Sequence, residues 1–157
     1  MYTSPSRLSE GARAKIADAL NAVLADGLDL HAGLKVAHWN LKGPHFPAFH
    51  ALFEEIATGL AAHADAIAER AVTLGGVARG TVRHVAKASR IAEYPQEARR
   101  DLEHVRHVAD RVDGFLEGAR AARTLAEQQG DPDTADLLTG VVRDLEKQGW
   151  FLRASLE

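Results

Sequence analysis

Hydrophobic residues recur every three to four positions through most of the chain, a spacing typical of helices that turn one face to a core. This spacing predicts four long helices. They run from about Leu8 to His38, from near Pro47 to Gly75-Gly76, from Pro95 to about Leu125, and from Gly130-Asp131-Pro132 towards the C-terminus. No alternation of apolar and polar residues typical of strands competes with the helical pattern.

The connection between the second and third helices is the most informative feature of this pattern. Residues 76–94 are too many for a hairpin turn, and a short helix is expected around Val82 to Ala88. A link of this length can traverse a bundle from end to end. We therefore predict an all-α, ferritin-like four-helix bundle, with a long crossover that carries a short helix. An unrelated up-and-down bundle is the alternative.

The composition limits the class of protein, its cellular location and the ligands available for a metal, but it does not indicate the function. The 157 residues, expected to form one domain (1–157), are 46% hydrophobic and 26% charged, which is ordinary for a globular protein. No segment is apolar enough to span a membrane, so we expect a cytoplasmic protein, with association with the nucleoid as a further possibility. The chain has no cysteine, so any metal must be bound by His, Asp and Glu. A net charge of −3 does not favour strong binding to nucleic acid.

Two pairs of side chains in the second helix have the spacing of metal ligands. His50 and Glu54 are four residues apart, as are Asp65 and Glu69, so each pair shares one face of the helix. Imidazole and carboxylate together suit a divalent or trivalent cation. The fifteen residues from His50 to Asp65 span roughly 22 Å of helix, however, far more than one ion can bridge. The two half-sites must therefore find their complements elsewhere, most simply in a second copy of the chain.

The residues around these pairs resemble the Dps miniferritins, the starvation-induced members of the ferritin superfamily. The resemblance covers the whole chain in length and helix order. It rests on His38-Trp39-Asn40, Gly43-Pro44, His50, Glu54, Asp65, Glu69-Arg70 and Leu74-Gly75-Gly76. It implies that His38 and His50 from one subunit, with Glu54 beside them, bind iron together with Asp65 and Glu69 of the two-fold partner.

The resemblance also implies an activity and an assembly. Members of this family are ferroxidases that oxidise Fe(II), preferably with hydrogen peroxide and otherwise with oxygen. They mineralise the ferric product inside a cage of twelve subunits and so protect against oxidative stress. Zinc could compete with iron for the site. The alternative is a protein that mainly binds and protects DNA; because the terminal arms are short and not basic, we expect weak or absent DNA binding.

The remaining candidates receive weaker predictions. No Glu-x-x-His pair occurs, so an iron site in the middle of the bundle is not expected. Asp101, His104 and His107 are expected on a solvated face. Structural roles are expected for His31, His45, His63 and His84, with support of the metal ligands as an alternative for His45 and His63. Trp39 is expected to pack at the dimer interface, with electron donation to iron as an alternative. The cation entry path is predicted to involve three acidic residues, Asp131, Asp133 and Asp136.

Overall fold

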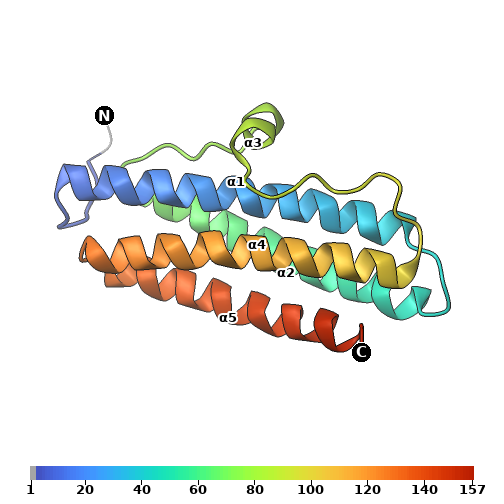
Figure 1. The fold of residues 1–157 in the computed structure, drawn as a ribbon. Helices are drawn as coiled ribbons and strands as arrows, with labels where there is room; N and C mark the ends of the chain where they lie inside the picture. Colours follow the sequence, from blue (N-terminus) through green and yellow to red (C-terminus); the bar gives the residue numbers. More distant parts are fainter. Residues whose placement is uncertain (1–2) are drawn as a thin grey trace.

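The computed structural model describes residues 3–157, so residues 1 and 2 of the predicted domain lie outside the described part. It contains the helices α1 (Glu10–Asn40), α2 (Phe46–Thr73), α3 (Val82–Ala88), α4 (Asp101–Gln128) and α5 (Pro132–Ala154). The four long helices lie side by side, and α3 stands outside α1 (Figure 1). Between residues 3 and 157 the only strand-like pairing is one isolated bridge, from Lys42 to Arg100. The predicted all-α bundle is confirmed.

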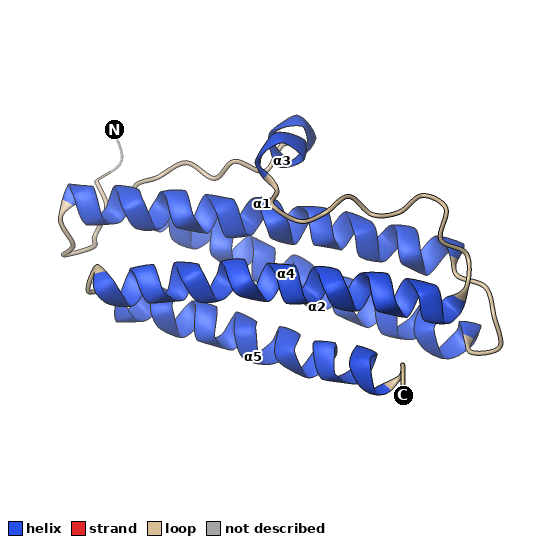
Figure 2. Ribbon diagram, in the orientation of Figure 1, coloured by secondary structure: helices blue, strands red, loops and turns tan. Residues whose placement is uncertain are grey.

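The connections decide how the helices run. A short loop joins α1 to α2 and another joins α4 to α5, so each of these pairs packs as an antiparallel hairpin. The long crossover returns along the outside of α1 to the end where α2 began, so α2 and α4 run in the same direction (Figure 2). This is the topology predicted from the length of the connection, and α3 has the bounds predicted for its short helix.

Polar side chains of α1 hold the first part of the crossover. The buried Asn21 amide donates to the Val77 carbonyl at 3.0 Å and accepts the Arg79 backbone N–H at 2.8 Å. Further along, the buried Asp26 carboxylate accepts both the backbone N–H and the guanidinium of Arg90. Because these groups would be costly to bury unpaired, they fix the crossover against one face of α1.

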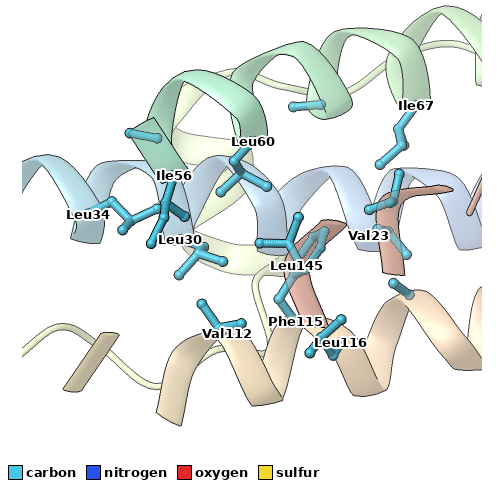
Figure 3. Close-up of a cluster of buried hydrophobic side chains, with 14 of the residues drawn as sticks. Val23, Leu30, Leu34, Ile56, Leu60, Ile67, Val112, Phe115, Leu116 and Leu145 are labelled. Atoms are coloured by element: carbon cyan, nitrogen blue, oxygen red, sulfur yellow. The ribbon is translucent and has the colours of Figure 1, made fainter. Parts of the chain in front are cut away.

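The core lies between the two hairpins. Apolar side chains of the α1–α2 hairpin point towards those of the α4–α5 hairpin (Figure 3). They are Val23, Leu30 and Leu34 of α1, Ile56, Leu60 and Ile67 of α2, Val112, Phe115 and Leu116 of α4, and Leu145 of α5. All of these side chains are buried. Each contributes about 1.5–3 kcal/mol by leaving water, so the buried stripe fixes the rotation of every helix. The opposite faces of α1 and α2 remain available to carry a site.

The start of α4 differs from the prediction. The helix begins at Asp101 rather than at Pro95, because the residues before it pair with the α1–α2 loop. The Lys42 N–H donates to the Arg99 carbonyl at 2.9 Å, and the Asp101 N–H donates to the Lys42 carbonyl at 2.9 Å. The Glu103 carboxylate then accepts the Arg99 N–H at 3.0 Å, which satisfies a donor just before the first turn.

The prediction of a solvated face for Asp101 and His104 is wrong. His104 is 1% exposed, and its Nδ1 lies 2.6 Å from the hydroxyl of Tyr94 in the crossover. The Asp101 carboxylate is covered by the α1–α2 loop and accepts the His45 N–H at 2.9 Å. The α1–α2 loop covers Asp101, and Tyr94, ten residues earlier in the chain, packs against His104. The charge-rich local pattern does not reveal such contacts.

Candidate metal centre

His38 and His50 form the centre of the candidate site, where the end of α1 meets the start of α2. Their imidazole rings stack, with centroids 3.7 Å apart and planes inclined by 20°. His38 Nδ1 lies 2.7 Å from the His50 carbonyl oxygen, and His50 Nδ1 lies 2.9 Å from the His38 carbonyl oxygen. The His38 carbonyl is in the last turn of α1, where helix geometry leaves carbonyls without an intrahelical partner.

These hydrogen bonds determine which ring nitrogens can bind a metal. A carbonyl oxygen only accepts, so each Nδ1 must carry a proton to make its bond. In the neutral imidazole the lone pair is then on Nε2, and both histidines keep that nitrogen free for a metal. A backbone partner that fixes the tautomer and orientation of the ring is a typical support for a histidine ligand.

Glu54 brings a carboxylate to the same place. It lies one turn after His50 on α2, and its Oε2 is 3.6 Å from His38 Nε2. The ammonium of Lys35 forms an ion pair with the same oxygen. The hydrogen bond from Lys35 lowers the pKa of Glu54 below its ordinary value, so this carboxylate is ionised near neutrality. The structure therefore brings three of the five predicted residues together, His38, His50 and Glu54.

Lys35 is a site residue that the sequence prediction missed. It lies three positions before His38, which places both on one face of α1. That spacing was the available signal, but a lysine does not bind metals as imidazole and carboxylate do, so the search for ligands passed over it. Lys35 also approaches the exposed Trp39, at 5.9 Å from the ring centroid, and Trp39 is 68% exposed in the isolated chain.

Asp65 and Glu69 are not brought to this cluster. They lie on α2 after His50, and α2 is unbroken from Phe46 to Thr73, so roughly 22 Å of helix separates Asp65 from His50. Both side chains are exposed, and neither carboxylate has a hydrogen-bonding partner in the described part of the chain. Within residues 3–157, no three His, Asp or Glu side chains are arranged to hold a metal ion. One copy of the chain thus presents two separate half-sites.

Arg70, the next residue in the motif, has a structural role. Its guanidinium donates to the Asp131 carboxylate at 2.8 Å and to the Thr134 hydroxyl at 2.8 Å. Asp131 is 3% exposed and caps the first turn of α5 through the Thr134 N–H. Burial raises the pKa of Asp131, but the hydrogen bonds from Thr134 and Arg70 outweigh it and leave the pKa below its ordinary value. The predicted cation-entry role for Asp131 is therefore wrong, whereas Asp133 and Asp136 are exposed.

The other histidines lie outside the cluster. His63 Nε2 is 2.9 Å from the Asp144 carboxylate of α5, and the backbone N–H of His45 holds Asp101. His84 is on α3. His31 is half-buried and lines a groove between α1 and α2 that Asp65 also lines.

Comparison with known proteins identifies the family. A ferritin-like domain matches residues 17–157. The DNA protection during starvation protein of Agrobacterium fabrum is 38% identical over 156 residues, which cover 99% of this chain and 96% of that protein. The chain belongs to the Dps family of miniferritins.

Solved Dps structures have the same fold as this chain. Mycobacterium smegmatis Dps, in its tetragonal form, is 31% identical with a TM-score of 0.94, covering 100% of this chain and 94% of that one. DpsA14 from Streptomyces coelicolor is 36% identical with a TM-score of 0.93, covering 98% and 91%. The Vibrio cholerae Dps protein, 29% identical with a TM-score of 0.92 over 100% and 99%, is described as a member of a broad superfamily of ferritin-like diiron-carboxylate proteins. The predicted family and the ferritin-like fold are confirmed.

Proposed function

We propose that this Dps-family protein is a ferroxidase that oxidises Fe(II) at sites shared between two subunits and stores the ferric product in a hollow homo-oligomer. The observation that carries the proposal is the His38–His50 pair, in which both Nδ1 atoms face carbonyl oxygens and both Nε2 atoms remain free. The ionised Glu54 adds an oxygen ligand. So few ligands bind Fe(II) without filling its coordination positions, which leaves room for an oxidant.

Asp65 and Glu69 of the partner subunit complete each site. His50 and Asp65, one from each half-site, lie on the unbroken α2. If a two-fold axis runs two α2 helices antiparallel, His50 of each subunit therefore lies opposite Asp65 of the other. An isologous interface of this sort repeats every contact, so each dimer holds two equivalent sites. The exposure of Asp65, Glu69 and Trp39 in the isolated chain is in keeping with an interface on this face.

The reaction transfers one electron from each of two Fe(II) ions to hydrogen peroxide. The O–O bond breaks, two protons are taken up, and two water molecules leave, so no hydroxyl radical is released. Carboxylates prefer the harder Fe(III), and Glu54, Asp65 and Glu69 therefore favour the loss of an electron. Lys35 keeps the Glu54 carboxylate charged before iron arrives. Oxygen is the slower alternative oxidant, and removal of both Fe(II) and peroxide protects against oxidative stress.

The cage itself is proposed from the family. Twelve subunits with tetrahedral symmetry enclose the mineral. Each subunit is one domain over residues 1–157, and the assembly is in the cytoplasm. Asp133 and Asp136 remain candidates for drawing cations to an entry path, because both carboxylates are exposed.

Between residues 3 and 157, no helix is both long and apolar enough to cross a membrane. Zinc is expected to compete with iron, because imidazole and carboxylate bind it too.

DNA binding is the alternative function, and we expect it to be weak. With a net charge of −3, the chain has no excess of cations to neutralise phosphates. In a gel shift at physiological salt, the assembled protein is expected to leave a DNA fragment unretarded. Tight retardation that weakens steeply as salt is added would contradict this expectation.

The test of the proposed function is the double variant His38→Ala/His50→Ala. It removes both free Nε2 ligands, so peroxide-driven oxidation of Fe(II) is expected to fall to the rate in buffer. The matched control His84→Ala changes a histidine on α3 that is not one of the proposed iron ligands, and is expected to keep the wild-type rate. Light scattering on both variants shows whether the assembly is retained. Oxidation at the wild-type rate in the assembled double variant would exclude these histidines from the reaction.

A further inference from the structure

Phe46 places an aromatic ring beside one of the two histidines of the metal centre. It is the first residue of α2, and its ring centroid lies 5.0 Å from that of His50, with the two planes inclined by 30°. The two residues are four positions apart, so one turn of the helix brings their side chains together. His50 therefore has a second aromatic neighbour besides His38.

The other contacts that hold the His50 imidazole come from α1. The ring stacks on that of His38, with centroids 3.7 Å apart, and its Nδ1 lies 2.9 Å from the His38 carbonyl oxygen. Because these contacts cross from one helix to another, a small shift between α1 and α2 changes both of them. Phe46 differs, since it belongs to the same helix as His50 and moves with it. Its contact persists while the two helices adjust.

The start of α2 fixes the position of Phe46 itself. The Phe46 N–H donates to the Gly43 carbonyl at 3.1 Å, which closes the turn before the helix. Pro47 follows in the first turn of the helix, where its ring restrains φ near about −65°. The backbone that carries the Phe46 side chain is thus held by the turn on one side and by the proline on the other.

The orientation of the His50 ring decides which of its atoms faces a metal. A half-turn of the ring about its bond to Cβ exchanges Nδ1 with Cδ2 and Nε2 with Cε1. The hydrogen bond to the His38 carbonyl would then be lost, and Nε2 would leave its place. The ring torsion of histidine is broad, so the helix backbone alone does not fix it. The hydrogen bond selects one orientation, and the neighbouring rings keep the imidazole in the plane that permits this bond.

We propose that Phe46 is a positioning residue of the iron site, whose ring holds the His50 imidazole so that Nε2 stays directed to the metal. This inference rests on the proposed function, because it concerns a ligand of the proposed site. A favourable aromatic pair changes an equilibrium constant by about 2- to 10-fold. Loss of the Phe46 ring is therefore expected to weaken metal binding by about this factor and not to abolish it, since both contacts from His38 remain.

The dependence of the rate on Fe(II) concentration tests this role. Phe46→Leu removes the ring and keeps an apolar side chain, whereas Phe46→Tyr keeps the ring. In peroxide-driven oxidation, Phe46→Leu is expected to raise the KM for Fe(II) by about 2- to 10-fold with kcat close to the wild-type value, because every iron ligand is retained. Phe46→Tyr is expected to keep the wild-type KM. The control is Leu102→Ala on α4, because Leu102 is 39% exposed and Phe46 is 40% exposed. A wild-type KM in Phe46→Leu, or a raised KM in Phe46→Tyr, would overturn the proposal.

Binding of Co²⁺ tests the same role without any oxidation. Co²⁺ accepts imidazole and carboxylate ligands, and its visible absorbance changes when it binds, so it can be titrated spectroscopically. The dissociation constant is expected to rise in Phe46→Leu by the same factor as the KM, and to stay at the wild-type value in Phe46→Tyr. Equal dissociation constants in the wild type and in Phe46→Leu would refute the positioning role.

Light scattering on each variant separates positioning from assembly. Phe46→Leu is expected to assemble as the wild type does; where it does not, Phe46→Met fills the same space without a ring. Loss of assembly in both variants would make Phe46 an interface residue and overturn the proposal. A wild-type protein that binds Co²⁺ but oxidises no Fe(II) would refute the proposed ferroxidase, and weaker Co²⁺ binding in Phe46→Leu would then still support the role of Phe46.

Discussion

The sharing of iron sites between subunits can be tested by complementation. One variant, His38→Ala/His50→Ala, keeps Asp65 and Glu69; the other, Asp65→Asn/Glu69→Gln, keeps both histidines. Each variant alone is expected to be inactive. In a dimer of one copy of each, one site pairs the two damaged halves and the other pairs the two intact halves. Every mixed dimer thus regains one of its two sites.

The magnitude follows from the symmetry of the interface. Random pairing of equal amounts makes half of the dimers mixed, and half of their sites are intact, so about a quarter of wild-type activity is expected. The two variants are unfolded together, refolded, and assayed for peroxide-driven Fe(II) oxidation by absorbance. The same proteins refolded apart and then combined give the baseline. Recovery no greater than this baseline would refute sharing, since sites within one chain gain nothing from mixing.

Two further predictions concern the loop and the buried histidine. Gly43 has φ +151°, and a Cβ there would lie 2.4 Å from Asp101 Cγ, so Gly43→Ala is expected to lower the free energy of unfolding by about 1–3 kcal/mol in urea titrations. Gly114→Ala, where a Cβ meets nothing within 4 Å, is the control and should not destabilise. Burial lowers the pKa of His104 below its ordinary 6.5, so the unfolded chain takes up this proton first as the pH falls. The folded state should therefore lose stability below pH 6.5, by at most about 1.4 kcal/mol per pH unit, and His104→Phe should reduce that loss between pH 7.5 and 5.5. An unchanged slope in this variant would assign the loss to other groups.

The sequence by itself determined the helices and the order in which they pack. Their apolar periodicity is a local signal, repeated over many turns, and the long connection before α4 leaves few ways to close a four-helix bundle. The short helix expected around Val82 to Ala88 is observed there. The motif also indicated His38, His50 and Glu54, which the structure brings together, and helix rise alone separated Asp65 and Glu69 from them.

Tertiary structure alone decided what each polar side chain does. Lys35 joins the site because α1 lies against α2, and the free Nε2 atoms follow from bonds between rings and distant carbonyls. Asp131 is buried against Arg70, and His104 is buried against Tyr94. Burial and pairing depend on which segments meet in space. Hydrophobic periodicity predicts which face of a helix is buried, but it does not predict which residues of other segments contact that helix.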